Sequence, residues 1–209
     1  AVPAYEAELL YISPLWIREH ATLIDDAAPK GTGERDFALL YLTSGVDVQP
    51  VPTTLPYLSL DTKLQSKERI GDTVTVAGYP TSDPDVLISN AALPLQTATT
   101  TVSDLYTFGT NYGDIYLLGG SAIGMQGVSG GPVVDATGTA IGLIVTRGDD
   151  STQGAGSLNA ITLSYVNRAM QEETGLELSA MISGNISYRA HLFQATIVPY
   201  LAELLEAEL

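Results

Sequence analysis

The feature that most limits how this chain folds is the segment 126–132, which runs Gln-Gly-Val-Ser-Gly-Gly-Pro. Glycines on both sides of one serine allow a backbone turn whose N–H groups point toward a single position beside the serine. The apolar pair Val133-Val134 follows, then Gly138 and a second apolar run, residues 141–145. The pattern therefore predicts two short strands joined by a glycine turn, with a serine held where the first strand begins.

Ser129 is the candidate nucleophile, because a serine hydroxyl reacts when a base takes its proton and fixed N–H groups receive the oxyanion. A glycine-rich turn with an incidental serine is the alternative interpretation. The motif G-x-S-G-G-P, followed by strand, glycine turn and strand, resembles the nucleophile segment of trypsin-like serine peptidases of the chymotrypsin fold. The resemblance implies that Ser129 attacks the substrate and that the N–H groups of Gly127 and Ser129 form the oxyanion hole.

A second segment of the same family lies upstream. Residues 36–42, Asp-Phe-Ala-Leu-Leu-Tyr-Leu, resemble the segment D-[IL]-A-L-L-x-L, whose aspartate orients the catalytic histidine. That role needs a carboxylate that accepts from the imidazole N–H and stabilises the imidazolium. The resemblance implies this role for Asp36, and a solvated acid at the start of a strand is the alternative.

The histidine of the triad is harder to assign, because the chain contains only His20 and His191. Neither follows the T-A-x-H-type turn of the family. His20 follows Arg18-Glu19 and lies in a polar segment, residues 13–35, that its Pro and Gly residues predict to be a surface loop. His191 comes after the serine, against the family order, and a surface or core-edge position is expected for it. The sequence therefore favours neither histidine as the general base.

The family order suggests another place for the base. A strand similar to residues 5–12 follows the histidine turn in the family and comes just before the aspartate strand. If this alignment holds, the first strands of barrel one and the general base lie upstream of Ala1. No leader peptide is recognisable at Ala1, which agrees with this expectation. A closed first barrel built from residues 1–60 alone would refute it.

Composition excludes several other classes of function. The chain of 209 residues carries 9 Lys+Arg against 24 Asp+Glu, a formal net charge of -15 that disfavours nucleic acids and anionic membranes as partners. It has no cysteine, and hence no disulfide or thiolate site. It also has no run of about 18 apolar residues that would predict a membrane span. No acidic pair has the spacing of a calcium loop and no glycine-rich piece is followed by Lys-Ser/Thr, so no metal and no cofactor are expected.

The remaining pattern is one of short strands separated by Gly, Pro and Asp turns. Val74 and Val76 alternate with threonines, as on a half-buried strand. Strands are predicted at residues 5–12, 36–42, 70–80, 86–88, 92–102, 115–118, 133–134 and 140–146. One helix is predicted from Ser164, its N-cap, to Thr174 before Gly175, and another within residues 187–208, where Pro199 kinks or starts it.

These observations predict a mostly β protein, an antiparallel double β-barrel of the chymotrypsin type with C-terminal helices. The expected domains are a first, partial barrel with a linker at residues 1–60, a second barrel with the nucleophile at 61–162, and a helical extension at 163–209. The first barrel is incomplete if its opening strands precede Ala1. The family resemblance also implies an extracytoplasmic location, while the oligomeric state stays open.

The expected function is that of a serine endopeptidase that cleaves polypeptides through an acyl-enzyme. The alternative is a peptidase-like domain without activity that acts as a binding or scaffold module. The walls of the specificity pocket are expected at residues 123–125 and 144–147, which are mostly apolar and favour a small or apolar substrate side chain. Arg147 would instead favour an acidic one.

Overall fold

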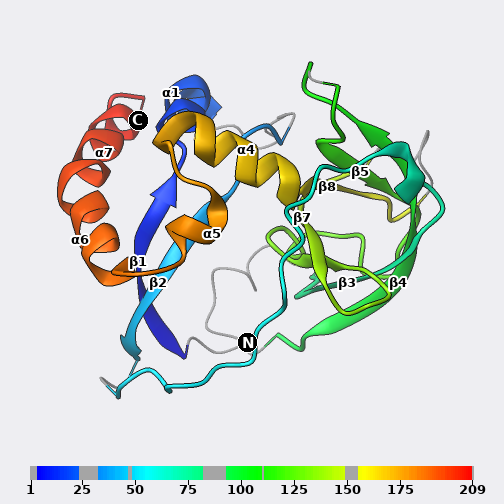
Figure 1. The fold of residues 1–209 in the computed structure, drawn as a ribbon, viewed down its shortest axis with the longest axis horizontal. Helices are drawn as coiled ribbons and strands as arrows, with labels where there is room; N and C mark the ends of the chain where they lie inside the picture. Colours follow the sequence, from blue (N-terminus) through cyan, green and yellow to red (C-terminus); the bar gives the residue numbers. More distant parts are fainter. Residues whose placement is uncertain are drawn as a thin grey trace. The chain divides into compact units, whose positions relative to one another are not determined.

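The computed structural model describes residues 4–23, 33–46, 49–81, 93–109, 111–148 and 155–208. The chain divides into two compact units (Figure 1). The first, the barrel unit, contains Pro56–Arg168, and the second, the helical unit, contains Pro3–Leu55 together with Ala169–Leu209. The predicted strand at 86–88 falls outside the described residues.

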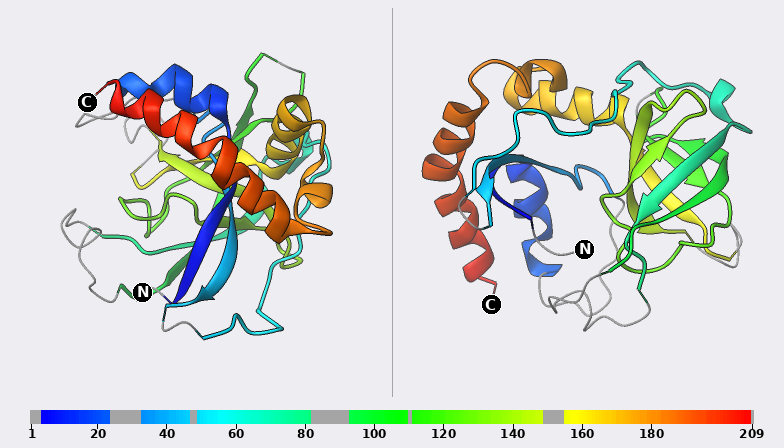
Figure 2. Two further views of the ribbon diagram at one scale, coloured as in Figure 1. Left: turned by 90° about the vertical axis from the view of Figure 1, so that its left-hand side faces the viewer. Right: turned by 90° about the horizontal axis from the view of Figure 1, so that it is seen from below.

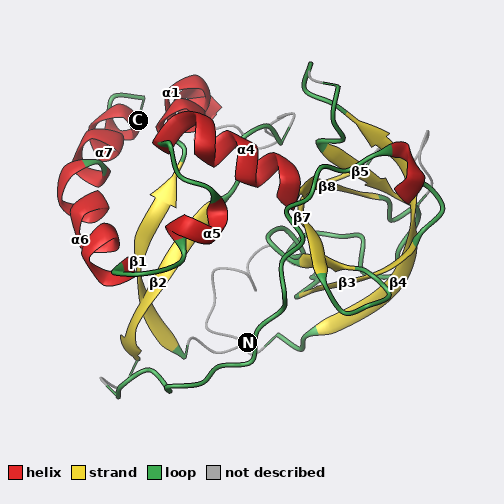
Figure 3. Cartoon of the chain, viewed as in Figure 1, coloured by secondary structure: helices red, strands yellow, loops and turns green. Residues whose placement is uncertain are grey.

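The barrel unit is a closed antiparallel barrel in the order β3-β4-β5-β8-β7-β6, drawn as the yellow strands on the right of Figure 3. Its strands are β3 (Thr73–Gly78), β4 (Gln96–Tyr106), β5 (Ile115–Leu118), β6 (Pro132–Val134), β7 (Ala140–Arg147) and β8 (Leu158–Thr162). Because the barrel is closed, each of the six described strands pairs with a neighbour on both sides. A closed barrel has no edge strand whose backbone N–H and C=O groups would be left unpaired.

The barrel core follows from the alternation of side chains along the strands. Val74 and Val76 of β3 are 1% and 0% exposed, while Thr73 and Thr75, which alternate with them, are exposed, as the sequence predicts. Val133, Ile141 and Ile144 from the strands that follow the serine turn are equally buried. The interior of the barrel is therefore filled by apolar side chains, and the serine turn leads directly into one of its packed strands.

The helical unit contains a two-stranded antiparallel sheet, β1 (Tyr5–Ile12) with β2 (Ala38–Gly45). Helix α6 (Ile186–Thr196) packs along β1, and α7 (Val198–Glu206) follows it and contacts α1 (Pro14–His20) (Figure 2). The described residues of this unit form no closed barrel. The predicted fold class is confirmed: one closed barrel of the chymotrypsin type, a second partial sheet and C-terminal helices.

Residues 13–35 were predicted to be a surface loop, and this prediction is wrong for their first part. Residues 14–20 form α1, and the short 3-10 helix η1 (Ala21–Leu23) continues it. Ser13 caps the helix by accepting from the Trp16 N–H at 3.1 Å, and Pro14 occupies the first turn. Serine followed by proline is a helix-start signal that the loop interpretation overlooked.

The C-terminal helices begin and end near the predicted residues, with one correction. Helix α4 (Leu163–Thr174) stops at Gly175, which has a φ of 75° and donates to the Gln171 carbonyl. Its cap is Thr162 and not Ser164, because the Thr162 hydroxyl accepts from the Tyr165 N–H at 3.1 Å. Pro199 starts α7. A four-residue helix, α5 (Leu178–Met181), and β8 were not predicted.

The three predicted domains stay a prediction. In the structure residues 169–209 group with residues 3–55, and α4 runs from the barrel unit into the helical unit. No helix among the described residues combines the length and the apolar character that crossing a membrane requires.

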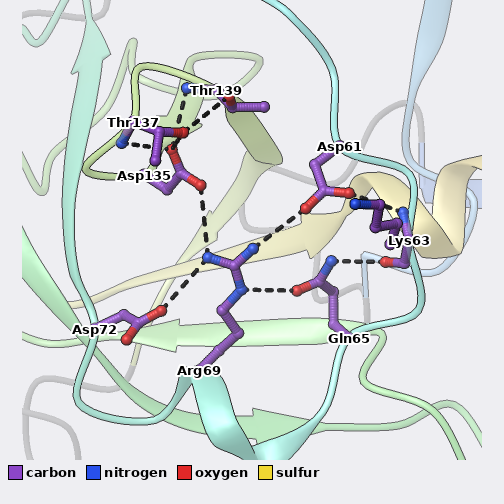
Figure 4. A network of polar contacts seen from close by, with 8 residues as sticks. All are labelled: Asp61, Lys63, Gln65, Arg69, Asp72, Asp135, Thr137 and Thr139. Carbon is purple, nitrogen blue, oxygen red and sulfur yellow. Dashed lines mark hydrogen bonds and ion pairs between the residues drawn. The ribbon is translucent and has the colours of Figure 1, made fainter.

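A polar network fastens loops of the barrel unit to one another (Figure 4). Arg69 lies in the 3-10 helix η2 (Lys67–Arg69). Its guanidinium forms ion pairs with the carboxylates of Asp61 at 3.2 Å, Asp72 at 3.4 Å and Asp135 at 3.5 Å. Its Nε also donates to Gln65 Oε1 at 3.1 Å. Asp135 lies in the turn that joins β6 to β7, the strands that follow the serine. One guanidinium thus connects the segment before β3 to the β6–β7 hairpin that directly follows the serine turn.

Candidate active site

The candidate nucleophile lies in a tight turn directly before β6. The Gly131 N–H donates to the Val128 carbonyl at 2.9 Å, which places Ser129 and Gly130 in the middle of the turn. Gly130 has a φ of 80°, the left-handed conformation that type II turns need at this position and that glycine adopts at no steric cost. The glycine after the serine is therefore required by the backbone.

The turn is anchored on both sides of the serine. Val128 is 2% exposed in the barrel core, and the Gly130 N–H donates to the Ile144 carbonyl of β7 at 2.7 Å. Ser129 itself is exposed, and its Oγ donates to the Val145 carbonyl at 3.3 Å. A solvent-accessible hydroxyl on a fixed backbone is what a nucleophile requires, because the substrate must reach it without rearrangement of the turn.

Two carbonyls before the serine are held by the segment that follows β3. Thr81 N–H donates to the Gln126 carbonyl at 2.9 Å, and Tyr79 N–H donates to the Gly127 carbonyl at 3.3 Å. In a trans peptide the N–H points opposite to the carbonyl of the same plane. The Gly127 N–H is therefore directed away from Thr81, and Gly127 has a φ of 87°.

The N–H groups of Gly127 and Ser129 donate to no acceptor within the described part of the chain. The Ser129 N–H is turned away from the bond that the Val128 carbonyl forms with Gly131. Unpaired backbone N–H groups beside an exposed hydroxyl are a donor pair that an oxyanion could use. The structure thus places the exposed Ser129 hydroxyl and the unpaired N–H groups of Gly127 and Ser129 in one turn, and their roles in catalysis stay a prediction.

Close packing explains the glycine at position 131. A Cβ there would lie 2.0 Å from the Ala77 carbonyl oxygen of β3 and 2.8 Å from the Val128 carbonyl oxygen. Gly78 is equally confined, since its Cβ would lie 2.9 Å from the Val128 Cα. The end of β3 and the serine turn therefore fit against each other only when both contribute glycine.

Asp36 and His20 belong to the helical unit. Asp36 lies two residues before β2, because the strand begins at Ala38 and not at residue 36 as predicted. The Asp36 N–H donates to the Gly33 carbonyl at 3.2 Å. Burial raises the pKa of the Asp36 carboxyl above its ordinary value, and the charge of His20 lowers it in part. His20 is thus near enough to Asp36 to interact with it electrostatically.

The sequence predicted that His20 lies in a loop, and this is wrong, because His20 is the last residue of α1. Its ring stacks on Trp16 with a centroid distance of 5.1 Å, and its Nδ1 lies 2.8 Å from the Trp16 carbonyl oxygen. A carbonyl oxygen can only accept, so Nδ1 carries the proton and Nε2 keeps its lone pair in the neutral ring. His191 is exposed on α6.

The sequence predicted a strand at residues 70–80, but not that the residues at its end support the serine turn. Tyr79 and Thr81 hold the carbonyls before the serine through their backbone N–H groups, so no side-chain pattern indicates this contact. The electrostatic influence of His20 on Asp36 was also not predicted. It depends on a helix, α1, that the sequence interpretation treated as a loop.

The family of the chain follows from one comparison. A family model described as "Trypsin-like peptidase domain" matches residues 3–143, more than half of the chain. No curated protein matches the chain. The matched range contains the aspartate segment, β3 to β6 and the whole serine turn, the same segments that carry the resemblance in the sequence. The chain belongs to the family of trypsin-like peptidase domains.

Proposed function

We propose that this chain acts as a serine endopeptidase that hydrolyses peptide bonds through an acyl-enzyme. The observation that carries the proposal is the serine turn: an exposed Ser129 hydroxyl on a fixed backbone, beside the unpaired N–H groups of Gly127 and Ser129. Membership of the trypsin-like peptidase family supports it and implies a polypeptide substrate. An extracytoplasmic location is proposed from the family resemblance alone.

In the proposed mechanism, Ser129 Oγ attacks the carbonyl carbon of the scissile bond while a histidine takes the hydroxyl proton. The carbonyl oxygen becomes an oxyanion and accepts from the N–H groups of Gly127 and Ser129. The histidine then returns the proton to the leaving amine, the C–N bond breaks, and an ester to Ser129 remains. Water, deprotonated by the same histidine, hydrolyses this ester. Asp36 orients the imidazole and stabilises its charged form.

Two sources of the histidine fit this proposal. The charge of His20 lowers the pKa of Asp36 in part, and the Nε2 of His20 keeps the lone pair that a general base uses. A histidine upstream of Ala1, as the family order suggests, is the other source. Removal of His20 distinguishes between them.

The proposed specificity is for a small or apolar side chain before the scissile bond. Ile123 and Ile144 are 2% and 1% exposed and pack into the barrel core, so of the predicted wall residues it is Met125, 38% exposed, that offers apolar surface to a substrate. Arg147, at the end of β7, would favour an acidic side chain instead. A library of peptide substrates with varied residues at this position separates the two.

The test is labelling with a fluorophosphonate probe, followed by peptide mapping with mass spectrometry. We expect covalent modification of Ser129, none in Ser129→Ala, and strongly reduced labelling in Asp36→Asn. Labelling that survives His20→Ala would assign the base to another histidine, and His191→Ala is the matched control. If only a chain extended upstream is labelled, the base lies in the added segment. Absence of labelling in both chains would refute the proposal.

The alternative is a peptidase-like module that binds polypeptides without cleaving them. The contact of His20 Nδ1 with the Trp16 carbonyl favours it, because this nitrogen donates to a carboxylate in a functional triad. The same labelling experiment decides: an unreactive Ser129 in both chains, together with retained binding of denatured polypeptide, would support the module.

A further inference from the structure

The helical unit contains an open cavity of about 600 Å³ that the proposed peptidase chemistry does not use. This volume is within the usual range for sites that bind small molecules. Most of the wall is apolar and comes from β1, the start of α1, α5 and α6. It includes Leu10, Pro14, Leu15, Met181, Phe193 and Ile197.

One end of the cavity is polar, and its acidic residue Glu173 is already paired. The Glu173 carboxylate accepts from the Tyr11 hydroxyl at 3.0 Å and from the Ser13 hydroxyl at 2.9 Å, and Arg35 Nε donates to it at 2.9 Å. The side chain of Glu173 is 8% exposed. The charges of Arg35 and Glu173 therefore offset each other, and this pair builds the wall without needing a ligand.

Arg189 is the charged residue of the wall that has no acidic partner among the described residues. Its Nη1 donates to the Met181 carbonyl at 2.9 Å and to the Ser183 carbonyl at 2.5 Å, which holds the half-buried side chain in place. The N–H groups on Nε and Nη2 have no acceptor in the described part of the chain. Glu172 also lines the cavity, but its side chain is exposed to water, which screens its charge.

We propose that this cavity binds a small amphipathic monocarboxylate. The carboxylate accepts from Arg189 through the N–H groups on Nε and Nη2, a planar donor pair that matches two carboxylate oxygens. An aliphatic or aromatic body lies against the apolar wall, where burial of its surface supplies most of the affinity. The proposal depends on charge complementarity at one end and apolar contact along the rest, and it is independent of the peptidase proposal.

The test is isothermal titration calorimetry of the whole chain with decanoate below its micellar concentration. Decanol and decylamine serve as probes of equal length with no charge and with the opposite charge. Arg189→Gln removes the proposed partner, and Arg18→Gln removes an exposed arginine of the same unit that does not line the cavity. Glu172→Gln removes the one other uncompensated charge of the wall.

We expect one decanoate per chain, with binding weakened about tenfold or more in Arg189→Gln because a charged hydrogen-bonding partner is lost. Binding should be unchanged in Arg18→Gln and equal or tighter in Glu172→Gln. Leu192→Trp, at a wall position that is 47% exposed and so tolerates substitution, should block the cavity. Absence of decanoate binding overturns the proposal, and so does decanol or decylamine binding as tight as decanoate. Equal losses in the two arginine variants would also overturn it.

Discussion

Replacement of Arg69 by methionine tests how the barrel unit holds its loops together. Arg69 is 25% exposed, and the carboxylates of Asp61 and Asp135 that it contacts are 18% and 13% exposed. Asp72 is 44% exposed, so that pair is screened by water and adds little. Methionine keeps most of the apolar stem and removes the charge and every donor.

The expected cost comes from two sources. Each of the two shielded ion pairs is worth about 1 kcal/mol, at the upper end for pairs near a surface. Gln65, which is 6% exposed, loses the partner of its Oε1, and an unsatisfied buried acceptor costs about 1 kcal/mol or more. The free energy of unfolding of the barrel unit should therefore fall by about 2–4 kcal/mol in Arg69→Met.

The pH dependence of barrel stability provides a second test of the Arg69 network. Burial alone would raise the pKa of Asp135, but hydrogen bonds from Thr137 and Thr139 and the charge of Arg69 hold it below its ordinary value. The stabilisation from Asp135 is therefore present above the unfolded pKa of about 3.9 and is lost as the pH falls through the folded pKa. Arg69→Met should reduce this acid-dependent part of the stability.

The assay is hydrogen exchange of peptides from β3 and β6, measured by mass spectrometry, which reports on the barrel unit alone. Lys67→Met is the matched control, because Lys67 is an exposed residue of η2. A loss below 0.5 kcal/mol in Arg69→Met, or a loss equal to that of Lys67→Met, would refute the energetic role of the network.

Three further predictions concern packing and polar burial. Gly131→Ala should lower barrel stability by at least about 2 kcal/mol in thermal unfolding, because its Cβ would overlap the Ala77 carbonyl. The control Gly138→Ala should cost only about 1 kcal/mol, because Gly138 has a φ of 82° but open space around it. Tyr116→Phe should stabilise by about 1 kcal/mol in urea unfolding, because its buried hydroxyl has no partner among the described residues; a loss of stability would contradict this. Glu173→Gln should lower helical-unit stability by about 2–3 kcal/mol, because it breaks the ion pair with Arg35. The fluorescence of the single tryptophan follows this unfolding, and an unchanged unfolding midpoint would contradict the prediction.

The barrel and the serine turn could be predicted from the sequence because their determinants are local. Alternation along residues 73–76 gives the buried face of β3, and glycines at fixed offsets from Ser129 give the turn. The strand β8 was missed because it passes directly into α4, with no turn residue between Thr162 and Leu163. A strand that borders a helix without a break carries no boundary signal in the sequence.

The contacts that depend on distant segments could not be predicted. Arg69 meets Asp135 across 66 positions of sequence (135 − 69), and Glu173 meets Tyr11 across 162. Neither pairing follows from spacing or periodicity, since the fold alone brings these side chains together. The position of His20 is of the same kind. Its helix could have been predicted from Ser13-Pro14, but its electrostatic influence on Asp36 could not.

Asp36 offers a test of whether a polar group is kept for function at the expense of stability. Burial raises the pKa of its carboxyl, with only partial compensation from His20, so the charged form is less stable folded than unfolded. The stability lost to Asp36 therefore grows as the pH rises from the unfolded pKa, about 3.9, through the folded pKa, and it is fully present at pH 7. Asp36→Asn should raise the unfolding midpoint of the helical unit at pH 7 but not at pH 3, while it reduces fluorophosphonate labelling of Ser129. A destabilised variant at pH 7 would show that the carboxylate has a structural role, and a stabilised variant with unchanged labelling would remove Asp36 from the proposed triad.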